Sequence, residues 1–175
     1  LFTLGPALRQ VRSHPMKYWI SLPRDWNERS RYPIAVGVEG AGSNFEGYAR
    51  NMHNSRGDRG FICLVPVSFS NTNQINASRY PYSAEVIQQA ERDRLGFDQA
   101  GLLAALDDVR QDFGAEEGFY ITGFSGGGML TWRMVFACSE QVRLAAPMNA
   151  NFYAHCAAVE SVARQDVPVR AFQGD

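Results

Sequence analysis

The stretch GFYITGFSGGGM, residues 118–129, places one serine among glycines directly after an apolar run. Its residues 123–127 match the pattern Gly-x-Ser-x-Gly, which is typical of a nucleophilic serine at a sharp turn from a strand into a helix. Such a turn holds the serine in a strained backbone conformation that exposes its hydroxyl. Because the strand and the helix nearly touch, the residues two positions away must be small, and Gly123 and Gly127 are. The pattern therefore indicates Ser125 as a catalytic nucleophile.

A glycine-rich turn can also pack tightly without doing chemistry, or it can bind a phosphate group. Neither Gly-x-x-x-x-Gly-Lys-Ser/Thr nor Gly-x-Gly-x-x-Gly occurs around Ser125, so no motif supports a phosphate site. A tightly packed turn without chemistry is the alternative to a nucleophile.

A second glycine-containing turn, in the stretch VGVEGAGSN (residues 36–44), ends an earlier apolar run. When a serine attacks a carbonyl group, the oxygen that becomes negative needs two backbone N–H donors. One comes from the residue after the nucleophile and the other from the loop after an earlier strand. Gly126 and Ala41 lie at these two positions. We therefore expect their N–H groups to form an oxyanion hole; the alternative is an ordinary turn at the end of a strand.

Apolar runs and helical patterns alternate along the chain, with no linker or repeat between them. This alternation predicts a single three-layer α/β domain over residues 1–175, with a mostly parallel sheet. Ligands in such domains bind at the carboxyl ends of the strands. The expected strands cover residues 16–23, 32–40, 61–69, 118–124, 143–149 and 167–172; the expected helices cover residues 45–57, 97–113 and 127–140; and residues 70–96 form a long polar connection.

The composition argues against several kinds of partner. The 17 Lys and Arg residues balance 18 Asp and Glu residues, so no charge excess indicates nucleic acid or an anionic membrane surface. No apolar run reaches the roughly 18 residues of a membrane-spanning helix. We predict no metal and no cofactor, because no His, Cys or carboxylate cluster has metal-ligand spacing. The chain begins at Leu1 rather than at a methionine, which is compatible with a removed targeting segment and a secreted or periplasmic protein.

The three cysteines match no zinc or redox spacing. Cys63 lies in an apolar run and is expected to be a small core residue. Cys138 and Cys156 could form a disulfide in an exported protein, and free thiols are the alternative.

Taken together, these features resemble the α/β-hydrolase superfamily, and within it the esterases related to polyhydroxybutyrate depolymerases and feruloyl esterases. The resemblance rests on the stretches YWISLPRDW, VEGAGSN, FYITGFSGGGML and VPVRAFQGD. It implies a serine esterase that forms an acyl-enzyme on Ser125, with a histidine acting first as base and then as acid. The implied substrate is a small-molecule or polymeric carboxylic ester.

The chain departs from this family at two places. Glu39 stands where the family commonly has a histidine. The triad order in this fold is serine, acid, histidine, and the resemblance places the acid just after VPVRAFQGD and the histidine a strand and a helix later. The chain would thus lack the C-terminal part of the fold. Asp175 comes slightly early for the acid, and none of the histidines lies at the family's position. These are His14, His53 and His155, of which His155 is the best placed because it follows the end of a strand.

Three alternatives to an esterase stay open at this point. The first is a peptidase that resembles prolyl oligopeptidase. The second is a dienelactone-type hydrolase, although such enzymes normally carry a cysteine nucleophile. The third is a binding protein that uses the fold without catalysis. Since a sheet that ends near residue 172 would expose an edge, we also expect a second chain or a dimer to cover it.

Overall fold

The sheet of the computed structural model, which describes residues 5–157 and 166–174, has six strands in the order β1-β2-β4-β3-β5-β6. Three of the five strand pairings are parallel, namely β4 with β3, β3 with β5 and β5 with β6. Strands β1 and β2 join one edge in antiparallel pairings. The strands span Ala7–Gln10 (β1), Lys17–Ser21 (β2), Tyr32–Val38 (β3), Ile62–Pro66 (β4), Ala115–Phe124 (β5) and Val142–Met148 (β6).

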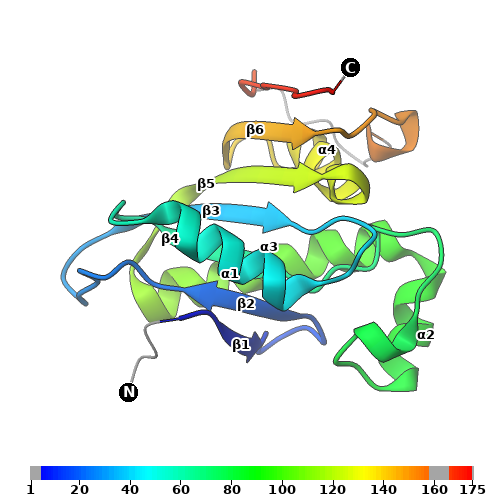
Figure 1. The fold of residues 1–175 in the computed structure, drawn as a ribbon, viewed down its shortest axis with the longest axis horizontal. Coiled ribbons are helices and arrows are strands. Elements are labelled where there is room, and N and C mark those ends of the chain that lie inside the picture. The colour runs from blue at the N-terminus through cyan, green and yellow to red at the C-terminus, as the bar shows by residue number, and fades with distance from the viewer. Residues whose placement is uncertain (1–4, 158–165, 175) are drawn as a thin grey trace.

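Helices cover both faces of this sheet (Figure 1). Helix α1 (Phe45–Arg56) packs on β2, β3 and β4 from one side. Helices α3 (Arg94–Phe113) and α4 (Gly128–Ala137) pack on β3, β4, β5 and β6 from the other. The predicted three-layer α/β fold with a mostly parallel sheet is therefore confirmed.

The central strands are buried on both faces, which explains their nearly continuous apolar sequences. All five residues of β4 are buried, and so are most of the residues of β3. Helix α3 faces them with apolar side chains at helical spacing. The main core includes Ile34, Val36, Val38, Ile62, Leu64, Leu102, Leu106, Val109, Phe119, Ile121, Leu130 and Met134.

The connection between β4 and α3 is more regular than the sequence indicated. It contains a short 3₁₀ helix, η1 (Ala77–Arg79), and a helix, α2 (Ala84–Arg92). Helix α2 is mostly polar and packs Val86, Ile87 and Ala90 against a second, smaller cluster that contains Phe69 and Tyr80. The helix within this polar connection was not predicted, because it docks through only three apolar residues on one face.

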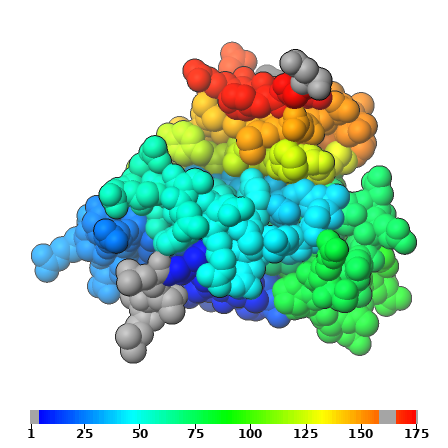
Figure 2. All heavy atoms as spheres, in the orientation of Figure 1, coloured from blue at the N-terminus to red at the C-terminus, as the bar shows by residue number. Residues whose placement is uncertain are grey.

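The last described segment lies along β6, but it does not form the continuous strand expected over residues 167–172. Two isolated parallel bridges join them, Val169 with Ala145 and Phe172 with Met148. Figure 2 shows this segment, in red, lying against the orange surface of β6. The Phe172 side chain is 56% exposed. That a second chain or a dimer covers this edge stays a prediction, which sedimentation measurements on the purified protein would test.

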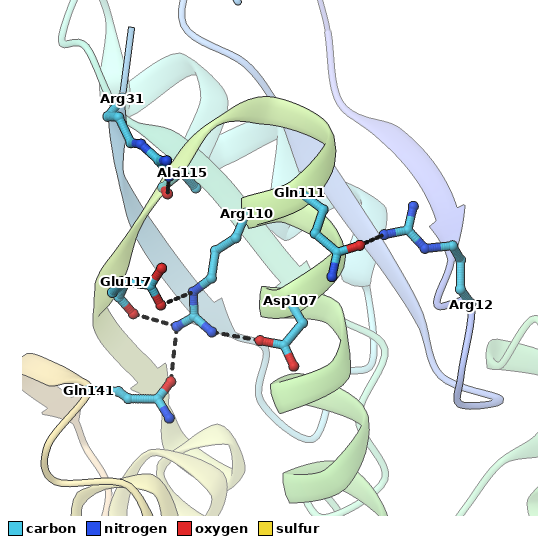
Figure 3. A network of polar contacts seen from close by, with 8 residues as sticks. All are labelled: Arg12, Arg31, Asp107, Arg110, Gln111, Ala115, Glu117 and Gln141. Carbon is cyan, nitrogen blue, oxygen red and sulfur yellow. Dashed lines mark hydrogen bonds and ion pairs between the residues drawn. The ribbon is translucent and has the colours of Figure 1, made fainter.

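A polar network joins the amino ends of the strands to α3 (Figure 3). Arg110 on α3 donates to Asp107 Oδ1 at 2.8 Å, to Gln141 Oε1 at 2.9 Å and to the carbonyl oxygen of Glu117. Arg31 donates to the carbonyl oxygen of Ala115 at 3.2 Å. These bonds fix the start of β5 and the approach to β6, while the opposite ends of the same strands are left to form a site.

The cysteines are all buried and free. Cys63 lies in the core as expected, and Cys138 and Cys156 do not form the disulfide considered above. Within the described ranges no helix combines the length and the hydrophobicity that crossing a membrane requires. In the same residues, no three His, Cys, Asp or Glu side chains are grouped so that they could hold a metal ion.

Candidate active site

The turn after β5 has the strained geometry expected from its sequence. Strand β5 ends at Phe124, and a 3₁₀ turn, η2 (Ser125–Gly127), leads directly into α4. Ser125 has a φ of 51°, in the left-handed region that is costly for a residue with a side chain. The sharp reversal places Ser125 at the carboxyl end of a central strand and at the start of a helix.

The glycines around Ser125 are required by close backbone contacts. A Cβ atom on Gly123 would lie 2.3 Å from the carbonyl oxygen of Gly127. A Cβ atom on Gly126 would lie 1.9 Å from the carbonyl oxygen of Asn71. Both distances are far inside van der Waals contact, so only glycine fits.

The loop after β3, residues 39–44, borders the serine. Strand β3 is paired in parallel with β5 up to Val38 and Gly123, which brings the two loops to the same edge of the sheet. A Cβ atom on Gly40 would lie 2.9 Å from the carbonyl oxygen of Phe124 and 3.5 Å from Cβ of Ser125. The structure thus brings the two segments singled out in the sequence together.

A cleft of about 550 Å³ opens at this edge of the sheet. The three residues predicted to form the site, Ser125, Ala41 and Gly126, all line it. None of its described lining residues is Asp, Glu, Lys or Arg. The remaining lining residues are Ser70, Asn71, Thr72, Asn73, Met129, Asn149, Ala150, Asn151, Tyr153 and His155.

Two residues that line this cleft, Ala41 and Gly126, have backbone N–H groups with no acceptor among the described residues. The N–H of Gly126 belongs to the first turn of a helix, where such groups have no partner within the helix. No acceptor for it, or for the N–H of Ala41, is found in residues 5–157 and 166–174. Their neighbour Ser43, by contrast, donates its N–H to the carbonyl oxygen of Gly40 at 3.1 Å.

Glu39, the residue at the family's histidine position, turns back onto its own loop. Its carboxylate accepts hydrogen bonds from the N–H groups of Gly40 and Asn44, while burial raises its pKa above the ordinary value despite these bonds. Glu39 does not line the cleft. The departure from the family pattern therefore affects how the loop is held rather than the surface that a ligand meets.

Backbone strain is concentrated at the same edge of the sheet. Three non-glycine residues have a positive φ in the described chain: Ser43 at 51°, Ser125 at 51° and Asn149 at 47°. They lie in the loops after β3, β5 and β6, respectively. Strained residues of this kind cluster at functional sites.

Asp175, considered above as the acid, lies outside the described residues.

Of the three histidines, the structure brings only His155 to the cleft. Its ring stacks on Tyr153 with 5.7 Å between centroids. His14 accepts a hydrogen bond from the N–H of Met16 at 3.1 Å. His53 contacts Arg56 on α1.

Several solved structures share this fold. Poly(aspartic acid) hydrolase-1 from Sphingomonas sp. KT-1 has a TM-score of 0.62 at 21% identity, over 85% of this chain and 58% of that chain. A thermostable esterase has a TM-score of 0.57 at 19% identity, over 95% and 45%. Pyrococcus horikoshii acylaminoacyl peptidase has a TM-score of 0.60 at 20% identity, over 87% and 24%. The chain has the α/β-hydrolase fold.

The comparisons define the α/β-hydrolase fold and no narrower group. No protein-family model matches the sequence, and no curated protein does. The chain spans about half the length of the first two solved chains, 58% and 45%. The resemblance to polyhydroxybutyrate depolymerases and feruloyl esterases therefore stays a prediction.

The contacts of two buried residues, Asp98 and Asn71, were not predicted from the sequence. Asp98, on α3, is fully buried and accepts the N–H groups of Phe69 at 2.8 Å and Ser70 at 2.6 Å. Burial raises the pKa of its carboxyl to about 7. A carboxylate inside an apolar helix face was the available signal. The hydrogen bonds of the Asn71 amide had no such signal, because they join loops that are distant in the sequence.

Proposed function

We propose that this protein is a serine hydrolase that cleaves carboxylic esters through an acyl-enzyme on Ser125. The observation that supports this most directly is the shared cleft. Ser125 lies there in a strained turn, in the same cleft as Ala41 and Gly126, whose N–H groups have no acceptor in the described part of the chain. A nucleophile and two donors at one place are the parts that acyl transfer needs.

In this proposal the Oγ atom of Ser125 attacks the ester carbonyl carbon while a general base takes its proton. The carbonyl oxygen becomes negative and accepts hydrogen bonds from the N–H groups of Ala41 and Gly126, which stabilise it more than they stabilise the starting ester. The C–O bond then breaks, and the alcohol leaves with the proton from the base. Water attacks the acyl-enzyme in the same way, releasing the acid and restoring Ser125.

The cleft favours a neutral ester. Its described lining carries amide and hydroxyl side chains but no charged residue. A polyanion such as poly(aspartic acid) would find no cation there, and its desolvation would go uncompensated. A volume of about 550 Å³ suits a small molecule or the end of a polymer.

A peptide bond is the second candidate, favoured by the likeness to acylaminoacyl peptidase. The same serine and donors serve both reactions, so the leaving group decides between them. Turnover of 4-nitrophenyl acetate should exceed turnover of an N-acetyl amino-acid 4-nitroanilide well beyond their intrinsic difference in reactivity. The reverse preference would favour the peptidase.

Replacing Ser125 tests the proposal. In the full-length protein, Ser125→Ala should lower kcat for 4-nitrophenyl acetate by at least about 1,000-fold, because it removes the attacking atom. Ser55→Ala, at an exposed position on α1, is the matched control and should change nothing. Turnover that survives in Ser125→Ala would overturn the proposal and favour the binding protein without catalysis.

A further inference from the structure

We propose that Asn71 is a positioning residue for the oxyanion hole, and this inference rests on the function proposed above. Asn71 lies in the loop after β4, between the loop that carries Ala41 and the turn that carries Gly126. Its side chain holds the first of these, and its backbone abuts the second. The residue thereby sets the spacing of the two N–H donors.

The side-chain amide of Asn71 is buried and fully used. Only 1% of the residue is exposed. Its Nδ2 donates to the carbonyl oxygen of Gly40 at 2.8 Å and to Oγ of Ser43 at 3.4 Å. Its Oδ1 accepts from Oη of Tyr80 at 3.1 Å, and that hydroxyl also contacts Oγ of Ser43 at 3.1 Å. One amide therefore links two points of the loop after β3 to Tyr80.

The backbone of Asn71 makes the contact with the other donor. Its carbonyl oxygen lies so close to Gly126 that a Cβ there would stand 1.9 Å away. Gly126 cannot approach further without a clash. The distance between the two donor segments is therefore limited by this contact on one side and by the amide of Asn71 on the other.

Asn71 is itself held in place by buried groups. Asp98 accepts the N–H groups of the two preceding residues, Phe69 and Ser70. The ring of Tyr80 stacks on Phe69 with 4.8 Å between centroids and an interplanar angle of 12°. The support of Asn71 is thus part of the packed interior, which is what precise positioning requires.

Other side chains bind several of the remaining polar groups of the loop. Glu39 accepts the N–H groups of Gly40 and Asn44, and Arg79 donates to the carbonyl oxygen of Gly42. The N–H of Ala41 is left pointing to no protein acceptor among the described residues. The loop is thus held at Gly40, at the carbonyl oxygen of Gly42 and at Asn44, on both sides of the Ala41 N–H.

The test compares variants of Asn71 and Tyr80. Asn71→Asp keeps the shape but replaces the donor to Gly40 with an acceptor, and Tyr80→Phe removes only the supporting hydroxyl. Asn71→Asp should lower kcat for 4-nitrophenyl acetate about 10- to 100-fold, because displacement by about 1 Å has effects of that size. KM should change less than about threefold, and Tyr80→Phe should give a smaller loss of kcat. Asn51→Ala, which removes an amide at an exposed position on α1, should behave as wild type.

The affinity for a trifluoromethyl ketone separates positioning from mere folding. Such a ketone adds to the serine and places a negative oxygen in the hole, so its affinity should fall by the same factor as kcat. Folded variants whose kcat stays within threefold of wild type, or whose KM alone rises, would overturn the inference. If Asn71→Asp fails to fold, an unchanged kcat and ketone affinity in Tyr80→Phe would overturn it. Turnover that survives in Ser125→Ala would instead contradict the proposed function itself.

Discussion

The backbone of Gly127 lies against Val38, so close that a Cβ atom on Gly127 would stand 2.3 Å from the carbonyl oxygen of Val38. This contact joins the first turn before α4 to the end of β3. Together with the parallel pairing of β3 and β5, it holds the turn carrying Ser125 close to the loop carrying Ala41. A chain that could not make the contact would separate the nucleophile from one donor.

Gly127→Ala should therefore destabilise the protein. The atoms nearest to the added Cβ, the carbonyl oxygens of Val38 and Glu39, belong to the backbone, so no side chain can move aside. We expect the free energy of unfolding to fall by about 1–3 kcal/mol, measured by urea denaturation, and ester turnover to fall with it. Gly60→Ala is the matched control, since nothing lies within 4 Å of a Cβ there, and equal stabilities of the two variants would contradict the account.

His155→Ala should keep most of the turnover. A base in a triad needs a third group to orient it, and no hydrogen bond or ion pair from His155 to a carboxylate is found in the part of the chain described. We expect kcat within about tenfold of wild type and a change mainly in KM, since the ring lines the cleft. A loss of kcat as large as that in Ser125→Ala would instead identify His155 as the base.

Asp98 should make stability depend on pH. Its pKa is about 7 in the folded protein against 3.8 for the ordinary group, so between these values the folded state holds a proton that the unfolded state has lost. Raising the pH through this window should lower the free energy of unfolding by up to about 1.4 kcal/mol per pH unit. The measurement is urea denaturation of wild type and Asp98→Asn from pH 4.5 to 7.5.

The difference between these two proteins isolates the contribution of Asp98, because other groups titrate in both. The stability of wild type relative to Asp98→Asn should decline as the pH rises. A difference that stays constant, or grows with pH, would contradict the assigned pKa and its cause in burial.

Arg110 should contribute more to stability than an exposed arginine. Its side chain is 11% exposed and joins three partners from different segments. Arg110→Ala should cost about 1–3 kcal/mol in thermal or urea unfolding, because Gln141 and the carbonyl group of Glu117 lose a charged donor. Arg24→Ala should cost less than about 0.5 kcal/mol, since Arg24 faces Asp58 at 3.9 Å with both side chains more than four-fifths exposed, at 84% and 93%.

Local patterns were enough to predict the central architecture. The apolar runs of β3 and β4 and the pattern at Ser125 each specify their structure through nearby residues, and the strain at Ser125 follows from the glycines around it. The short edge strand β1 was not predicted, because its residues are largely exposed and show no apolar alternation. Helix α2 was missed because its docking depends on a cluster assembled from distant residues.

The candidate site divides in the same way. Ser125, Ala41 and Gly126 could be named from their position relative to strands. The amide of Asn71 could not, since it acts on Gly40, 31 positions away along the chain. Sequence spacing carries no information about which buried polar group meets which loop. The same holds for Asp98, whose partners at residues 69 and 70 lie on another element.

The central claim is that Ser125 is a nucleophile, and covalent labelling tests it most directly. The protein would be treated with a fluorophosphonate, digested and examined by tandem mass spectrometry. The account predicts a phosphonyl group on Oγ of Ser125, formed with loss of fluoride, and ester turnover that disappears in proportion to labelling. Full loss of turnover with the label on another residue, or full labelling of Ser125 with turnover unchanged, would contradict it.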